Sequence, residues 1–267
     1  MANASLRQMS LWGKAKQMVQ EGVAYITGTN FWPLIFIKFS AAFVYGGSDV
    51  LNVSFSEQAS GNSVFGGEEQ EEARTSERLG LLFCSVGIGC FIGPIVCDHF
   101  TNMDSYNSIL SACVLSFFLM ALGCFGMAYF APFELTVFFT AVRASGSSIQ
   151  WIYSSLLLQV LSEPQMLGRV LSVDYGLALA SESFSAVIAG VLQDKYGLNA
   201  NQVSAVFAIL GLMAFGIWFS YHVLWSGSTN LQIEWEESLH VGTLMPVLEK
   251  IGVSRSMNES IVEVLVE

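Results

Sequence analysis

The segment ILSACVLSFFLMALGCFGMAYF, residues 109–130, decides the fold of this chain because it carries no charged side chain from end to end. A helix needs about 20 apolar residues to cross the hydrocarbon of a bilayer. Backbone polar groups cannot remain unsatisfied in lipid, so each such stretch is expected to be helical. The sequence therefore predicts an all-α, multi-pass membrane protein with a six-helix transmembrane domain over residues 31–225, whose spans are residues 31–53, 79–97, 109–130, 133–161, 170–192 and 203–225.

The composition indicates that most of the chain lies in lipid. Apolar residues make up 53% of it and charged residues 12%, whereas roughly a quarter of the residues in a soluble domain are charged. The net charge of −11 and the lack of a basic patch argue against nucleic acid as a partner. The expected partners are a lipid bilayer and a small-molecule substrate.

The sequence gives no sign of a metal site, a cofactor site or a catalytic residue. The cysteines have no CxxC spacing and no histidine at ligand spacing, and all lie in the second and third spans. We interpret them as small core residues: Cys84, Cys90, Cys97, Cys113 and Cys124.

Two regions flank the transmembrane domain. Residues 1–30 have apolar side chains at helical spacing, which predicts a short amphipathic helix at the membrane surface. Residues 226–267 form an acidic tail, and the loop 54–78 carries another acidic cluster outside the membrane. The positive-inside rule places both termini in the cytoplasm, by a margin of one basic residue: Arg7, Lys14, Lys16 and Arg169 against Arg74, Arg78 and Lys195.

Five ionisable residues lie inside the spans, where a charge costs about 3 kcal/mol and marks a candidate functional site. Lys38 and Asp49 share a helix face about 16 Å apart, which is too far for an ion pair. Arg143 and Glu182 come to similar depth on antiparallel helices, so we expect them to pair, either permanently or in step with transport. Asp174 lies near the start of its span, where we expect a solvated anchor.

The fourth span is unusually polar. It holds the run ASGSS, residues 144–148, followed by Gln150 and Trp151, a mixture unsuited to facing lipid. We therefore expect this helix to line a wet cavity. Small residues at every fourth position in the second and fifth spans predict faces for close helix packing or for sliding during a transport cycle: Ser85, Gly89, Gly93 and Cys97, with Ser181, Ser185 and Ala189.

Two motifs carry a resemblance to a known family. The first is YGGSDVLNV, residues 45–53; the second leads from SSLLLQ, residues 154–159, through Glu163-Pro164 to Gly168-Arg169-Val170. With Glu21-Gly22 and Tyr25 they resemble the major facilitator superfamily, and more narrowly helices seven, ten and eleven of its small-molecule exporters. The resemblance runs from about Glu21 to Trp225 and covers the six-helix C-terminal half, and the Gly-Arg-Val turn is its most specific part.

The resemblance implies cytoplasmic termini and a central cavity faced by helices seven and ten. It thereby places Lys38, Asp49, Arg143, Gln150 and Trp151 on or beside the substrate route, to which we add Glu182 as the expected partner of Arg143. Asp98, Arg169 and Asp174 are assigned to gating or cytoplasmic loops. Residues 93–100 keep a glycine and an acid, but they lack the basic run of the family's gating loop.

The expected function is transport of a small organic molecule as part of a secondary transporter, with proton coupling left open. Family members rock two six-helix halves about a shared site, and this sequence holds one half. It therefore predicts a truncated transporter, a half that pairs with a second half or a second copy, or a relic. The alternative is a non-transporting membrane subunit or regulator.

An intramembrane serine protease is a further alternative, because Gly146-Ser147-Ser148 lies within a span. Ile149 follows where a small residue is expected, and His222 lies at the end of the last span, far from a hydroxyl at mid-depth. We therefore expect no enzyme.

Overall fold

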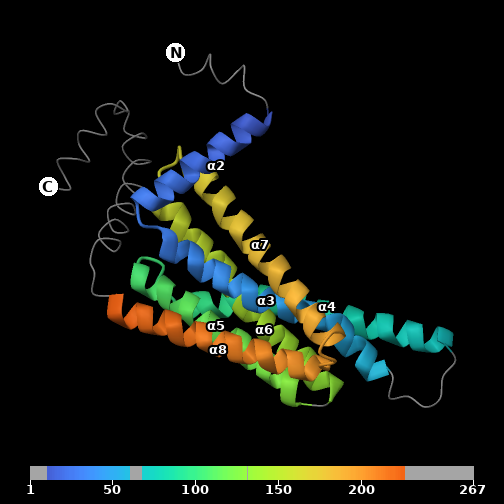
Figure 1. Cartoon of the computed structure of the whole chain (residues 1–267). Helices are drawn as coiled ribbons and strands as arrows, with labels where there is room; N and C mark the ends of the chain where they lie inside the picture. The colour runs from blue at the N-terminus through green and yellow to red at the C-terminus, as the bar shows by residue number, and fades with distance from the viewer. Residues whose placement is uncertain (1–10, 61–67, 131, 226–267) are drawn as a thin grey trace, which may run out of the picture.

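The computed structural model describes residues 11–60, 68–130 and 132–225, and all of its regular elements are helices. The predicted acidic tail, residues 226–267, and the first ten residues lie outside the described part. Figure 1 shows the helices, which are α2 Leu11–Gly28, α3 Trp32–Ser60, α4 Glu68–Phe100, α5 Tyr106–Tyr129, α6 Phe133–Leu161, α7 Leu167–Asp194 and α8 Ala200–Trp225.

Five of these helices are long and apolar enough to cross a membrane: α3, α4, α5, α7 and α8. They correspond to five of the six predicted spans. The remaining one, α6, has the predicted bounds of 133–161 but does not reach the same hydropathy. Its polar run and Arg143 lower its mean hydropathy, and they face other helices, because Arg143, Gln150 and Ser154 are buried. A helix enclosed by its neighbours does not need to be apolar throughout.

The predicted loop 54–78 is largely helical. Helix α3 continues to Ser60 and α4 begins at Glu68, so only residues 61–67 between them lie outside the described helices. An α-helix satisfies its own backbone hydrogen bonds and can therefore continue past the end of its apolar stretch. Hydropathy marks the membrane-crossing part of a helix, which is why the predicted spans 31–53 and 79–97 are shorter than α3 and α4. The first part of α4 projects from the bundle (Figure 1).

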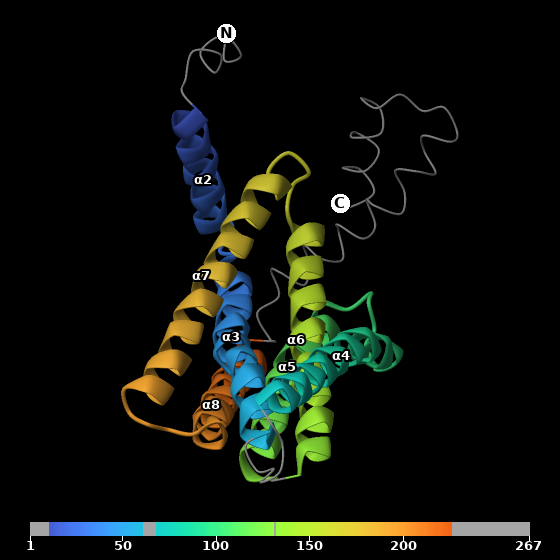
Figure 2. The same cartoon turned by 90° about the vertical axis from the view of Figure 1, so that its right-hand side faces the viewer.

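The bundle is organised around α3, α5 and α6. Helix α5 packs against α6 and α8, while α3 packs along α7 and also contacts α6 and α8. Figure 2 shows α6 and α7 leaving a common corner, with α3 between them. Two apolar clusters fill the interior, one around Phe117, Met120 and Tyr153 and the other around Leu51, Met127 and Phe207. The buried charged residues of the described part lie on α3, α6 and α7: Lys38, Arg143 and Asp174.

The predicted small-residue face of α4 is a contact face with α6. A Cβ at Gly89 would lie 2.2 Å from the carbonyl oxygen of Ala141, and one at Gly93 would lie 2.8 Å from Ser145. The Ser145 hydroxyl donates to the Gly89 carbonyl oxygen at 3.0 Å. Close backbone approach of this kind is how membrane helices gain packing contacts without large side chains.

Candidate functional site

Arg143 of α6 is fully buried and forms an ion pair with α3. Its Nη2 lies 3.2 Å from Asp49 Oδ1, and its Nη1 donates to Ser48 Oγ at 3.0 Å. The ring of Tyr45 covers the guanidinium, with Cζ 4.8 Å from the ring centroid. Asn52 Nδ2 donates to the same carboxylate oxygen at 2.9 Å. Charge-assisted hydrogen bonds and a ring face together compensate the burial of this cation.

The predicted pair of Arg143 with Glu182 is wrong, because Arg143 is bound to Asp49. Helix α7 packs along α3 and touches α6 only sparsely, so Glu182 faces α3. A Cβ at Gly46 would lie 2.5 Å from Glu182 Cγ, which shows how closely the two helices meet there. Counting residues addresses only depth along a helix, whereas pairing also depends on which helices are neighbours and on the direction in which each side chain points.

Lys38 of α3 forms a second ion pair with Asp174 of α7, and both side chains are fully buried. Lys38 Nζ also donates to Ser155 Oγ at 2.8 Å and lies over the rings of Trp151 and Tyr175, 5.1 and 4.7 Å from their centroids. In the described part of the chain, Asp174 Oδ1 has no hydrogen-bond partner. This cluster joins α3, α6 and α7 through one ammonium group.

The prediction of a solvated Asp174 near the membrane surface is therefore wrong. Asp174 lies in the second turn of α7, but α3 runs beside that turn and covers the carboxylate. The long Lys38 side chain reaches it from the neighbouring helix. The prediction that Lys38 and Asp49 do not pair with each other is confirmed, since each is paired with a residue of another helix.

A cavity of about 430 Å³ opens between α3, α4, α6 and α7. Three of the predicted pathway residues line it: Gln150, Trp151 and Glu182. The other three predicted pathway residues do not line the cavity. Lys38 contacts the ring of the lining residue Trp151, and Arg143 contacts the ring of Tyr45 and pairs with Asp49. The remaining lining residues are Ala41, Ala42, Tyr45, Cys90, Ser147, Ser148 and Ile152.

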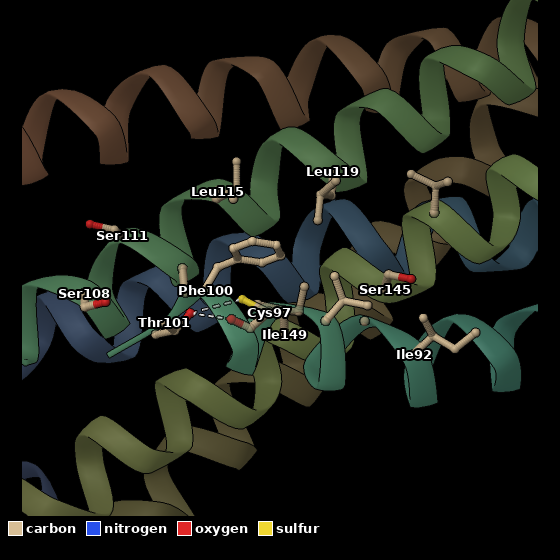
Figure 3. A pocket seen from close by; sticks show the side chains of 14 residues that line it. Ile92, Cys97, Phe100, Thr101, Ser108, Ser111, Leu115, Leu119, Ser145 and Ile149 are labelled. Atoms are coloured by element: carbon tan, nitrogen blue, oxygen red, sulfur yellow. Dashed lines mark hydrogen bonds between the residues drawn. The ribbon is translucent and has the colours of Figure 1, made fainter. Parts of the chain in front are cut away.

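A second recess, of about 490 Å³, lies between α4, α5 and α6 (Figure 3). Its wall is mostly apolar, with Phe100, Leu115 and Leu119 prominent, and the hydroxyls of Ser108 and Ser111 lie at one end. No charged side chain lines it in the described part, and none of the predicted site residues does. It therefore offers fewer groups for recognising a polar molecule than the cavity at Trp151.

The predicted loop residues lie in helices. Asp98 is an exposed residue in the last turn of α4, which runs through Pro94 to Phe100. Neighbouring helices in membrane proteins commonly accommodate a proline inside a helix, so residues 93–100 do not form the expected loop. Arg169 belongs to the first turn of α7.

Arg169 helps attach α2 to the α6–α7 corner. Its Nη1 lies 2.9 Å from Glu21 Oε2, and both side chains are more than a third exposed. The Glu163 backbone N–H donates to the Tyr25 hydroxyl at 3.2 Å, and Gly22 lies against the Arg169 backbone. The lead-in motif and the motif between α6 and α7 thus meet in space. The lead-in forms a helix; its location at a membrane surface stays a prediction.

Sequence reasoning missed several polar partners of the charged residues. Ser155 and Tyr175 surround Lys38, and Ser48, Asn52 and Tyr45 surround Arg143 and Asp49. A usable signal exists for α3, because Tyr45, Ser48, Asp49 and Asn52 have the three- and four-residue spacing that places them on one helix face. No such signal connects Ser155 with Lys38, since they lie on different helices.

Ser148 and His222 are not arranged as the nucleophile and base of a serine protease. The Ser148 hydroxyl donates to the Ser145 carbonyl oxygen of its own helix at 3.0 Å, while His222 Nε2 lies 2.9 Å from Ser111 Oγ. In the segments described, no group of three or more His, Cys, Asp or Glu side chains is placed to hold a metal ion.

No family model matches the sequence, and no curated protein matches it. Solved structures do match this chain in fold. The partially occluded inward-open xylose transporter XylE from E. coli is 14% identical, with a TM-score of 0.51 over 86% of this chain and 60% of that chain. The inward-open form is 16% identical, with a TM-score of 0.52 over 87% and 55%.

A third structure is the major facilitator superfamily proton:xylose symporter XylE bound to 6-bromo-6-deoxy-D-glucose. It is 12% identical and has a TM-score of 0.54, covering 86% of this chain and 51% of that chain. Such identities show the fold alone. The predicted resemblance to one half of a major facilitator transporter is confirmed at that level, and the chain spans about half to three fifths of the length of these neighbours.

Proposed function

We propose that this integral, multi-pass membrane protein is one half of a secondary transporter for a small organic molecule. The observation that carries the proposal is the cavity of about 430 Å³ beside α6, whose wall includes Gln150, Trp151 and Glu182. Buried polar side chains in membrane helices are costly, and they are typical of substrate and ion pathways. The fold shared with xylose transporters supports the same function, while the substrate of this chain need not be a sugar.

The two buried ion pairs allow the wall of the pathway to move as one body. Lys38–Asp174 joins α3 to α7, and Arg143–Asp49 joins α6 to α3. Each pair cancels its own charge, so helices that carry four ionised groups present little net charge to lipid. Transporters of this architecture move by rocking one rigid half against the other, and such pairs keep one half intact during the movement.

Completion of the pathway is part of the proposal. A second six-helix half, or a second copy of this chain, would cover the open side of the cavity. Export as the direction of transport and exchange for protons belong to the same proposal, with Glu182 as a carboxylate that can carry a proton at the cavity wall. Asp98 and Arg169 are proposed to act at the cytoplasmic ends of α4 and α7.

A non-transporting subunit is the second candidate. The chain covers 51–60% of the length of the neighbouring transporters, so transport by this chain is itself a proposal. A transporter that is truncated and inactive alone would behave in the same way.

Counterflow in proteoliposomes tests transport directly. The purified chain is reconstituted and loaded in turn with xylose, an organic cation or an organic anion, and the uptake of each labelled solute is compared with that of empty liposomes. Accelerated exchange of one solute, lost in Arg143→Gln, supports the proposal. No accelerated exchange of any solute favours the non-transporting subunit.

A further inference from the structure

The charges of the side chains around the cavity do not sum to zero. Lys38 is paired with Asp174 and Arg143 with Asp49, so these four side chains contribute no net charge. Glu182 is the charged residue of the cavity lining that remains to be considered. Within residues 11–60, 68–130 and 132–225, no lysine or arginine forms an ion pair with it. The wall therefore carries one uncompensated carboxylate.

Glu182 is in a position to meet a ligand. It is partly buried, and its side chain lines the cavity formed by α3, α4, α6 and α7. Its backbone and Cγ lie against Gly46, so the residue has little freedom to turn away from α3. A carboxylate in such a place loses water without gaining a cation, which is a cost that a positively charged ligand would remove.

Two aromatic rings line the same cavity. Tyr45 and Trp151 belong to facing helices, α3 and α6, and both already have a cation over the ring, Arg143 and Lys38 respectively. The faces of aromatic rings attract cations, and aromatic walls also bury the apolar body of an organic ligand.

A hydrogen-bond donor completes the lining. Gln150 is 1% exposed and its Oε1 accepts from Ser116 Oγ at 2.7 Å, but its Nε2 has no partner in the part of the chain described. Buried donors are normally satisfied, so this amide is available to an acceptor group on a ligand.

We infer that the cavity binds an organic monocation with an apolar or aromatic body, whose positive centre pairs with Glu182 between the rings of Tyr45 and Trp151. This inference rests on the proposed function for the route by which the ligand leaves, but the binding itself does not require transport. A neutral sugar would leave the carboxylate uncompensated, and an anion would be repelled by it.

Two probes of matched shape and opposite charge test the site. Tetraphenylphosphonium and tetraphenylborate are titrated into the full chain in detergent, and binding is measured by equilibrium dialysis. We expect saturable binding of the cation and none of the anion. Glu182→Gln, which keeps the side-chain shape, should weaken cation binding about tenfold or more, as expected for the loss of a partly buried charge pair.

Glu134→Gln is the matched control, because Glu134 is exposed in the first turn of α6 and lies outside the cavity lining. It should bind tetraphenylphosphonium like the unaltered chain. Equal cation binding by Glu182→Gln, equal binding of the two probes by the unaltered chain, or equal losses in both variants would overturn the inference.

The outcomes separate this inference from the transport proposal. Exchange of a neutral solute in proteoliposomes, together with cation binding that ignores Glu182, would support transport and overturn the cation site. Cation binding that depends on Glu182, with no accelerated exchange of any solute, would support the site and count against transport.

Discussion

The two buried ion pairs differ in how far they are closed to their surroundings. In the Lys38–Asp174 pair both side chains are fully buried, and Ser155, Trp151 and Tyr175 surround the ammonium group. In the Arg143–Asp49 pair the guanidinium is fully buried, but 31% of the Asp49 side chain is exposed. The first pair is enclosed on all sides by helices, whereas the second has one partner that is partly exposed.

This difference has an energetic consequence. Removing one partner of an enclosed pair leaves a charge with no solvent, which is far more costly than the net contribution of the intact pair. A partly exposed carboxylate can exchange its partner for water at lower cost. The structure therefore predicts a graded series of effects, from Lys38–Asp174 through Arg143–Asp49 to the exposed Arg169–Glu21 pair.

The largest effect is expected for Lys38→Met. The methionine keeps an apolar stem of similar length but leaves Asp174 buried without its cation, so the free energy of unfolding should fall by about 3–5 kcal/mol. Unfolding of the detergent-solubilised chain by sodium dodecyl sulfate, followed by circular dichroism, measures it.

The double variant Lys38→Met with Asp174→Leu sharpens this prediction. Because it removes both charges together, it should recover most of the stability that the single variant loses. A double variant as unstable as Lys38→Met would show that the loss came from packing rather than from the unpaired carboxylate.

A smaller effect is expected for Asp49→Asn. The amide oxygen can still accept from Arg143, and Ser48 and the Tyr45 ring continue to contact the guanidinium, so we expect a loss of about 1–3 kcal/mol in the same titration. A loss as large as that of Lys38→Met would contradict the distinction between an enclosed and a partly open pair.

The same comparison shows what could be predicted from the sequence. Each of the six long apolar stretches is helical in the structure, and the bounds predicted for α6 agree with it although that helix holds Arg143 and a polar run. Apolar length could not give the full length of α3 and α4, because a helix does not end where its lipid-facing part ends. Because charges in lipid need partners, Lys38 and Arg143 are predicted to face inward, and both are buried, while Asp49 and Glu182 are partly buried.

The choice of partners could not be predicted. Depth along a helix follows from counting at 1.5 Å per residue, but pairing also depends on which helices are adjacent and on their rotation. Depth alone matches Arg143 with Glu182, yet α7 packs on α3 and brings Asp174, not Glu182, to a cation. The position of Asp174 near the start of its span predicts solvent contact, because the sequence does not reveal that α3 covers it.

The smallest effect is expected at the exposed end of the series. In Arg169→Gln the pair with Glu21 is lost, but both side chains are more than a third exposed, and exposed pairs contribute about 0–1 kcal/mol. The stability of the whole chain should therefore hardly change in the titration that detects the loss in Lys38→Met. Because salt screens exposed charges, any remaining difference from the unaltered chain should shrink between low and high ionic strength.

The Tyr25–Glu163 hydrogen bond and the contact of Gly22 with the α7 backbone persist in this variant, so α2 should stay attached. Limited proteolysis between α2 and α3 measures that attachment: an unchanged rate of cleavage fits a corner built on backbone contacts, while faster cleavage at low salt would show that the ion pair holds α2 in place.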